Sequence, residues 1–266
     1  FFVDPNRRVY VRRVNIGGNT RTRDVVIRRE MRQFESAWYD ATKIQLSRDR
    51  VDRLGYFQNI NIETPPVPGT PDQIDVNVTV QEKPTGMINL GAGFSSTDKV
   101  VLSAGVSQDN IFGRGTTAGV ELNTGKTYRT IAISQTNPYF TQDGISRSTS
   151  LYYRTLRPLA INRGDYRIQT MGAGITFGVP FTETQRVFFG TTFEANDITT
   201  YDNSPQRYLD YVSAFGPRSN AVIFSVGWSN DRRDSALAPT RGTYQRAAAE
   251  SSLFGDLRYY KASYQH

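Results

Sequence analysis

Residue types that most often carry catalysis or bind metals are scarce in this sequence. It contains one histidine, His266, and no cysteine. A Ser-His-Asp triad, a histidine metal site and a thiolate nucleophile are therefore excluded within it. Residues 113–115 read Gly-Arg-Gly, but the Lys-Ser/Thr pair and helix of a phosphate-binding loop do not follow them. The sequence thus predicts no catalytic, cofactor-binding or metal-binding residues, and it indicates a protein that is not an enzyme.

Carboxylates are the remaining candidates for acid–base chemistry. Asp231 and Asp234 flank two arginines in a predicted turn, a pattern that favours an ion-pair cluster over catalysis. Glu121 and Glu194 fall on the small and polar side of predicted strands. Carboxylates are normal there if that side faces water.

Basic residues give the chain a net charge of +7, spread along its length. The densest run of arginines lies in residues 7–29 and raises the alternative of nucleic-acid binding. Asp24 and Glu30 interrupt the run, and no recognition motif accompanies it. We interpret it as a solvated face and expect no nucleic-acid partner.

From residue 86 onward, apolar residues alternate with small or polar ones between turns. This phase places Ile175 and Val226 on one face of a sheet and Gly174 and Ser225 on the other, because strand side chains alternate. Small and polar side chains cannot fill a dry core, so the pattern predicts a transmembrane β-barrel with Ile175 and Val226 facing lipid. About ten strands are expected, at residues 87–95, 100–109, 116–124, 129–137, 148–157, 165–179, 186–196, 222–230, 243–251 and 257–265.

Residues 9–82 mix strand and helix periods and predict a small α+β domain of order β-α-α-β-β. The expected elements are a strand at 9–14, a helix from a cap at Thr22 or Asp24 to Gln33, a helix between Asp40 and Gly55, and strands at 57–64 and 74–81.

The connections between the predicted barrel strands alternate between the two ends of the sheet, and they differ in length. The longest, at residues 197–221, lies at the opposite end from the connections that share a side with the N-terminal domain. Outer-membrane barrels keep short turns in the periplasm and long loops outside. We therefore expect the N-terminal domain to be periplasmic. No run approaches the length of a transmembrane helix.

Six short segments carry a family resemblance. They are residues 109–115, 137–140 and 234–242 in the predicted barrel, and residues 28–33, 53–57 and 67–76 in the N-terminal domain. Together they resemble the BamA family of outer-membrane protein assembly factors, in its last POTRA repeat and the N-terminal part of its barrel. The implied domains are a remnant of a preceding repeat at 1–5, a POTRA domain at 6–84 and part of the barrel at 85–266.

The chain departs from the family pattern at one loop and at the closing strands. The Val-Arg-Gly-Phe motif that folds into the family's lumen is absent. Ten strands alone would leave unpaired backbone edges in lipid, at several kcal/mol per group. We therefore expect an incomplete barrel and a piece of a longer chain.

The resemblance implies assembly and insertion of outer-membrane β-barrel proteins without covalent catalysis, in the outer membrane with the POTRA domain in the periplasm. The implied partners are unfolded client proteins, outer-membrane lipid, and assembly lipoproteins including BamD, which would dock at Arg28 and Glu35. The alternatives are a POTRA-bearing secretion transporter, of two-partner or TamA-like type, and a passive pore.

Two strands are candidate client-binding elements. An exposed edge at residues 57–63 could add an extended peptide, and its candidate residues are Phe57, Asn59, Asn61 and Glu63. Strand 87–94 is the expected lateral gate, because glycines inside it weaken packing against a partner. The gate residues are Met87, Ile88, Asn89, Leu90, Gly91, Ala92, Gly93 and Phe94.

Overall fold

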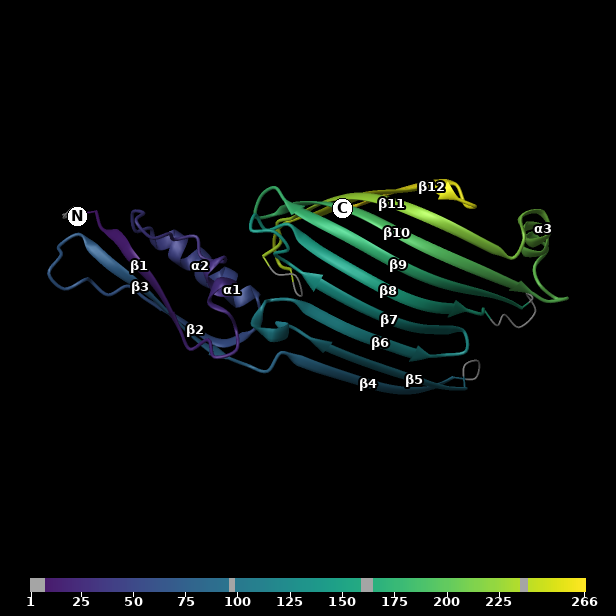
Figure 1. Ribbon diagram of the computed structural model, residues 1–266, viewed down its shortest axis with the longest axis horizontal. Helices are drawn as coiled ribbons and strands as arrows, with labels where there is room; N and C mark the ends of the chain where they lie inside the picture. Colours follow the sequence, from purple (N-terminus) through teal and green to yellow (C-terminus); the bar gives the residue numbers. More distant parts are fainter. Residues whose placement is uncertain (1–7, 96–98, 159–164, 235–238) are drawn as a thin grey trace. The chain divides into compact units, whose positions relative to one another are not determined.

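The computed structural model of the chain describes residues 8–95, 99–158, 165–234 and 239–266 (Figure 1). The repeat remnant expected at residues 1–5 lies outside them. The chain folds as two compact units. The first comprises Phe1–Gly86 with Gln108–Thr116, and the second comprises Met87–Ser107 with Thr117–His266. The domain boundaries expected from the sequence, 6–84 and 85–266, stay a prediction.

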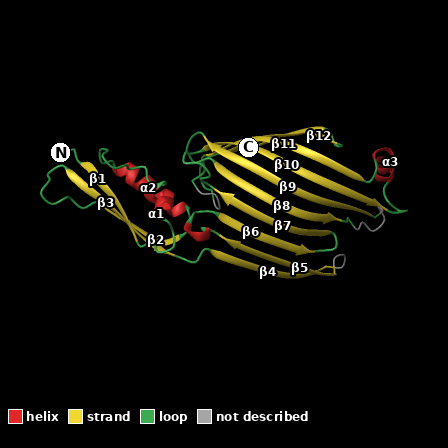
Figure 2. Ribbon diagram, in the orientation of Figure 1, coloured by secondary structure: helices red, strands yellow, loops and turns green. Residues whose placement is uncertain are grey.

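The first unit is a small α+β fold. Its elements are β1 (Tyr10–Gly17), α1 (Asp24–Arg28), α2 (Ala41–Arg53), β2 (Phe57–Glu63) and β3 (Gln73–Glu82). The sheet order is β1-β3-β2, with β1 parallel and β2 antiparallel to the central β3. Figure 2 shows the two helices and the strands of this unit. The β-α-α-β-β order predicted from the sequence is confirmed.

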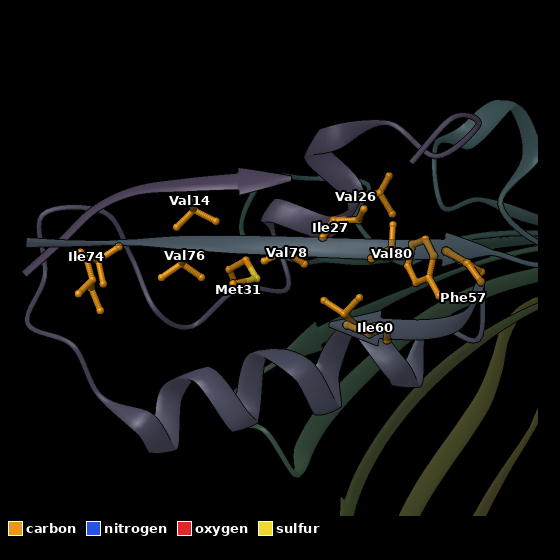
Figure 3. Close-up of a cluster of buried hydrophobic side chains, with 13 residues drawn as sticks. Val14, Val26, Ile27, Met31, Phe57, Ile60, Ile74, Val76, Val78 and Val80 are labelled. Carbon is orange, nitrogen blue, oxygen red and sulfur yellow. The ribbon is translucent and has the colours of Figure 1, made fainter. Parts of the chain in front are cut away.

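The core of the first unit lies between its sheet and its helices. In β3, Ile74, Val76, Val78 and Val80 are buried, and the residues between them are more exposed. This period of two is that of a strand with one buried face. Ile27 of α1 packs into the same cluster (Figure 3). Burying a side chain of this size contributes about 1.5–3 kcal/mol, so the cluster is the main source of stability in this unit.

Local signals set the ends of α2. The Asp40 carboxylate accepts hydrogen bonds from the backbone N–H of Thr42 at 2.8 Å and of Lys43 at 3.4 Å. It thereby satisfies two of the N–H groups that have no partner inside the helix. Gly55 follows the helix with φ of 74°, a conformation that glycine adopts without strain. Both predicted ends of this helix are confirmed.

The first helix is shorter than the sequence predicts. The prediction of a helix from a cap at Thr22 or Asp24 to Gln33 was wrong. The helix α1 ends five residues before Gln33, and no side chain caps its start. Gln33 is fully buried, and its amide binds backbone groups of the loop that follows. Its Nε2 donates to Trp38 O at 3.0 Å, and its Oε1 accepts from Asp40 N at 2.9 Å. These bonds stabilise a loop conformation that competes with the helix.

The second unit is one antiparallel sheet of ten strands, as predicted. The strands are β4 (Gly86–Ser95), β5 (Lys99–Gln108), β6 (Thr117–Thr124), β7 (Tyr128–Asn137), β8 (Ser146–Leu156), β9 (Tyr166–Pro180), β10 (Gln185–Thr200), β11 (Arg218–Asp231), β12 (Tyr244–Gly255) and β13 (Tyr259–Gln265). Neighbours in sequence are neighbours in the sheet, as Figure 1 shows. Within the described residues, β4 and β13 are its two edge strands.

The strand register divides this sheet into an apolar face and a polar face. Ile175 lies opposite Thr191, which lies opposite Phe224. Directly opposed residues share a face, and Val226 joins it two positions after Phe224. We call this side the apolar face. Gly174 and Ser225 fall on the other side, the polar face, so the strand phase expected from the sequence agrees with the register.

One helix was not predicted from the sequence. α3 (Gln206–Phe215) lies in the longest connection, between β10 and β11. Tyr208 stacks on Tyr166 of β9 with ring centroids 4.0 Å apart, and their hydroxyls are 3.1 Å apart. This stack holds the helix against the end of the sheet. In the part of the chain that the structure describes, no helix is long and apolar enough to cross a membrane.

Candidate functional surfaces

The two charged residues expected to dock a partner lie together at the outer edge of β1. Arg28 Nη1 is 3.4 Å from Glu35 Oε1. The same carboxylate oxygen accepts from Val14 N at 2.9 Å, and Arg28 Nη2 donates to Val14 O at 3.1 Å. Each charged side chain is about half exposed. The pair therefore satisfies both backbone groups of one edge residue and still presents charge to solvent.

The beginning of β1 is covered by the loop after α1. Ser36 N donates to Val11 O at 2.7 Å, and Val11 N donates to Ala37 O at 3.0 Å. Tyr39 N donates to Val9 O at 2.9 Å. Because unpaired strand edges invite pairing with other chains, this cover protects β1. Among the described residues β2 pairs only with β3, so β2 is the more accessible edge of the sheet.

The four residues expected on the client-binding edge occupy β2, but they do not point the same way. Phe57 is 3% exposed and belongs to the core, so only its backbone is available to a ligand. Asn59, Asn61 and Glu63 are exposed. The Asn61 amide donates to Glu63 Oε1 at 2.9 Å. An irregularity in the register between Phe57 and Asn59 separates the buried residue from this polar row.

The expected gate strand, β4, forms one edge of the ten-stranded sheet. Its apolar side chains are among the most exposed in the chain; Leu90 is 80% exposed and Phe94 77%. Its glycines differ from one another. A Cβ on Gly91 would lie 2.5 Å from Ser103 Oγ, whereas a Cβ on Gly93 would meet nothing within 4 Å. Gly91 therefore relieves crowding on the polar face, and Gly93 leaves the strand without packing.

A polar cluster on three adjacent strands was not predicted from the sequence. Tyr152, Gly172 and Glu194 are directly opposed across β8, β9 and β10. The Tyr152 hydroxyl donates to the Glu194 carboxylate, and Arg154 Nη2 lies 3.2 Å from it. A Cβ on Gly172 would lie 2.2 Å from the tyrosine ring, so the ring lies over the glycine. Only the strand register reveals this arrangement, since the residues are far apart in sequence.

The acidic residues of the β11–β12 connection have structural partners. Arg233 Nη2 is 2.7 Å from Asp231 Oδ2, which confirms the expected ion pair. Asp234 plays another part, because its Oδ1 accepts from Thr240 N at 3.0 Å and Arg241 N at 3.2 Å. Both carboxylates therefore stabilise the turn.

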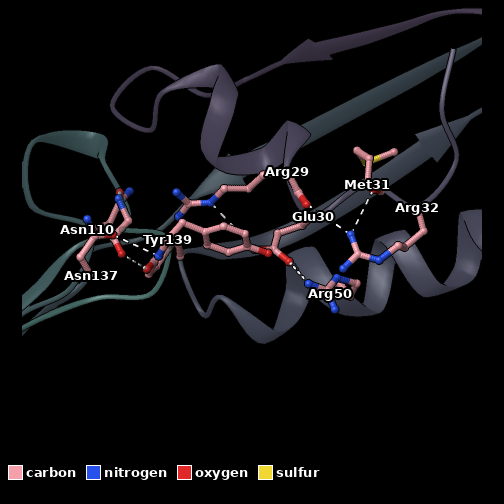
Figure 4. A network of polar contacts seen from close by, with 10 residues as sticks. Arg29, Glu30, Met31, Arg32, Arg50, Asn110, Asn137 and Tyr139 are labelled. Atoms are coloured by element: carbon pink, nitrogen blue, oxygen red, sulfur yellow. Dashed lines mark hydrogen bonds and ion pairs between the residues drawn. The ribbon is translucent and has the colours of Figure 1, made fainter. Parts of the chain in front are cut away.

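A buried ion pair links the end of the α1 region to α2. Glu30 Oε2 is 2.7 Å from Arg50 Nη2, and their side chains are only 6% and 16% exposed (Figure 4). Arg29 Nε lies 4.0 Å from the other carboxylate oxygen. In the sequence, Glu30 stands out only as an interruption of a basic run. Its burial in the turn after α1 was not predicted.

Two family models match the chain. The Omp85 superfamily domain matches residues 110–266, and the surface antigen variable number repeat, or POTRA, matches residues 9–83.

Individual proteins match both units together. Outer membrane protein assembly factor BamA of Neisseria meningitidis serogroup B is 40% identical over 273 residues, covering 98% of this chain and 34% of that protein. The crystal structure of BamA from Haemophilus ducreyi lacking POTRA domains 1-3 matches with a TM-score of 0.78 and 29% identity, over 97% of this chain and 51% of that one. CdiB from Acinetobacter baumannii matches with a TM-score of 0.62 at 11% identity, over 97% and 48%, a likeness of fold alone.

This chain thus spans about a third of the Neisseria protein and about half of the Haemophilus chain. The Omp85 model covers residues 110–266, more than half of the present sequence. The chain belongs to the Omp85 superfamily.

Proposed function

We propose that this chain is part of a factor that assembles and inserts β-barrel proteins in the outer membrane without covalent catalysis, with its first unit in the periplasm. The Neisseria relative is named an assembly factor. The combination of a POTRA-type unit with a wide sheet that has one apolar face supports the same role. The observation that carries most weight is the position of β4, an edge strand that follows the first unit directly.

Unfolded clients pair with β4 in this proposal. A strand edge at membrane depth presents N–H and C=O groups that no water satisfies, at several kcal/mol per group. A client strand that pairs with β4 satisfies them. Leu90 and Phe94 are exposed beside that edge, so an apolar client strand would extend the apolar face. Assembly by this route needs no chemical fuel.

A disulfide that locks β4 to the closing strand of the full-length barrel tests the gate. Client assembly should stop in the oxidised protein and recover on reduction. The matched control is a cysteine pair at Ser134 and Ser150, which are directly opposed on β7 and β8 away from either edge; this lock should leave assembly intact. Full activity with the seam locked would rule out the gate.

A POTRA-bearing secretion transporter, of two-partner or TamA-like type, is the second candidate function, because a fold does not by itself fix a function and a POTRA-type unit joined to such a sheet would also suit a transporter. A passive pore is a third. Depleting the protein in cells separates them. An assembly factor should lower the level of all outer-membrane barrels. Loss of one exported partner with normal barrel levels would favour a transporter, and unaltered levels of both would favour a pore.

Docking of an assembly lipoprotein such as BamD is proposed at Arg28 and Glu35, whose side chains are half exposed. Because Glu35 also accepts a bond from Val14 N, Glu35→Gln is the sharper variant: glutamine keeps the acceptor and removes the charge. Co-purification of the lipoprotein should fall with Glu35→Gln and fall further with Glu35→Lys, since reversal adds repulsion. Unchanged co-purification with both variants would remove this assignment.

Client peptides are also proposed to add to the edge of β2, through backbone hydrogen bonds that tolerate many sequences. Amide hydrogen exchange at residues 57–63 should slow when unfolded client peptides are added. Residues 10–17 of β1 serve as the internal control, because their edge is covered by Glu35, Arg28 and the loop after α1. Equal exchange with and without peptide at 57–63 would count against this site.

A further inference from the structure

The connection between β5 and β6 exposes a phenylalanine from a strained backbone position. Phe112 has φ of 52° and ψ of 27°, in the left-handed region that bulky residues rarely adopt. It is 85% exposed, so burial of its own ring does not compensate for the strain. Strain of this kind persists only where the surrounding structure imposes it, and it concentrates at functional sites.

Residues just before α1 impose this conformation. Gly113 O accepts from Arg23 N at 2.9 Å, and Asn110 Nδ2 donates to Thr22 Oγ1 at 2.7 Å. Gly113 approaches so closely that a Cβ there would lie 1.9 Å from Arg21 O. All of these residues belong to the first unit. The turn is therefore a fixed part of that unit and holds the exposed ring in place.

A cavity of about 910 Å³ lies beside the ring within the first unit. This volume is in the range of small-molecule sites. Phe112 and Tyr56 give its lining an apolar part, and Arg21 and Lys83 give it two positive charges. Among the described residues, neither of these two cationic groups has an ion-pair partner.

The one carboxylate in the lining is already occupied. Glu82 accepts from Thr22 N at 2.6 Å, and from Arg21 N and Thr20 Oγ1 at 2.9 Å each. Burial alone would raise the pKa of Glu82, but the hydrogen bonds from Thr22, Arg21 and Thr20 outweigh it and lower that pKa. Glu82 is therefore ionised, and Arg21 and Lys83 together leave the lining with a net positive charge, which suits an anion.

The chain runs from this site directly into three strands of the ten-stranded sheet. Gly86 begins β4, Gln108 ends β5, and β6 begins at Thr117, immediately after the turn. Where such strands cross a bilayer, their ends lie at the headgroup level, where aromatic rings are enriched. Basic side chains at that level attract anionic headgroups.

We propose that Phe112 and the cavity beside it form a site for an anionic phospholipid of the periplasmic leaflet. The phosphate binds between Arg21 and Lys83, and the ring of Phe112 enters the boundary between headgroups and acyl chains. This inference rests on the proposed function, because it requires the sheet to span the outer membrane. It gives the strained turn a role in lipid binding, whereas the proposed pairing of clients with β4 gives this turn no role.

A polarity-sensitive fluorophore tests the site in the full-length protein. A cysteine-free background is made, and Phe112→Cys is labelled with nitrobenzoxadiazole. Phe34→Cys is the matched control, a phenylalanine of the same unit that is 62% exposed. Both proteins are reconstituted in vesicles of phosphatidylcholine, with and without phosphatidylglycerol. The label at 112 should be blue-shifted, with a larger shift in phosphatidylglycerol, and the label at 34 should stay aqueous.

The double variant Arg21→Gln, Lys83→Gln should lose the response to phosphatidylglycerol and keep the shift seen in phosphatidylcholine. Inorganic phosphate should not reproduce the response; if it does, the site binds free phosphate and the lipid assignment is wrong. Identical spectra at 112 and 34 would overturn the proposal. Quenching of Trp228 by brominated lipids in the same vesicles separates the failures: quenched Trp228 with an aqueous label at 112 refutes this site alone, and unquenched Trp228 refutes the membrane-spanning sheet as well.

Discussion

Replacing Ile175 by arginine tests which face of the ten-stranded sheet meets lipid. Ile175 lies near the middle of β9 on the apolar face and is 36% exposed. An arginine on the lipid side of a barrel costs about 2–4 kcal/mol at the bilayer midplane. Since about 1.4 kcal/mol is a factor of ten in an equilibrium constant, folding should become about 30- to 700-fold less favourable.

Ser225→Arg is the matched control on the polar face. Ser225 lies opposite Glu250 in the strand register, and Glu250 Oε1 is 3.5 Å from Lys261 Nζ. Gly190 lies beside it without a side chain; a Cβ there would lie 2.5 Å from Ser225 Oγ and 3.0 Å from Thr176 Oγ1. The new guanidinium gains a carboxylate neighbour without entering lipid, so its cost should stay within about 0.5 kcal/mol, as at an ordinary surface position.

Urea titration of the two variants in lipid vesicles gives the difference, with the heat-modifiable mobility of the folded barrel on gels as the readout. The Ile175 variant should be less stable by at least about 1.5 kcal/mol, the lower lipid cost less the control's own. Equal midpoints, or a less stable Ser225 variant, would mean that the apolar face does not meet lipid.

Three further outcomes are expected. Glu30→Ala should lower the unfolding free energy of the first unit by about 3–5 kcal/mol in urea denaturation, because it removes the carboxylate that pairs with buried Arg50. A loss below about 1 kcal/mol, as small as at an exposed position, would contradict this expectation. Gly172→Val should abolish heat-modifiable folding, since its Cβ would overlap the Tyr152 ring, whereas Gly227→Ala should not, having no neighbour nearer than 3.5 Å. Because the pKa of Glu82 is lowered by folding, its ionised carboxylate stabilises the first unit at pH values above the ordinary carboxyl pKa. This stabilisation is lost as the pH falls through the lowered pKa of the folded state. Glu82→Gln should weaken the dependence of unfolding free energy on acid pH, and an unchanged pH profile would contradict this role of Glu82.

Strand number and strand phase were predictable from the sequence because each is encoded locally. Alternation of apolar and small residues places every second side chain on one face, and turn residues separate the strands. The cap at Asp40 and the stop at Gly55 were predictable for the same reason. The pairing of Tyr152 with Glu194 was not, because it depends on register across three strands.

Elements set by tertiary contacts were missed. The helical pattern after Asp24 stops early because buried Gln33 binds the backbone of the following loop. In α3, Tyr208, Val212 and Phe215 follow a helical spacing, with Gly216 at the end in a positive-φ conformation. The helical spacing was therefore present in the sequence, but the turn residues of this long connection predicted a loop.

The expected docking pair shows why site residues are harder to predict than folds. Arg28 and Glu35 were assigned by resemblance as charges for a partner. In the structure each side chain forms a hydrogen bond with the backbone of Val14. No sequence pattern predicts these bonds. A charge can therefore stabilise its own domain and still be available at the surface, and only a variant that separates these two tasks can distinguish them.

The central claim, that clients pair with the edge strand β4, is tested most directly by disulfide trapping during assembly. Single cysteines replace Ile88 or Leu90 in β4 and, as the control, Leu151 in β8; all three are exposed, at 70%, 80% and 56%. A client carries one cysteine in its terminal strand. The account predicts that the client cross-links to β4 in a defined register while it assembles, and does not cross-link to position 151. Productive assembly with no cross-link to β4, or with equal cross-linking at position 151, would contradict it.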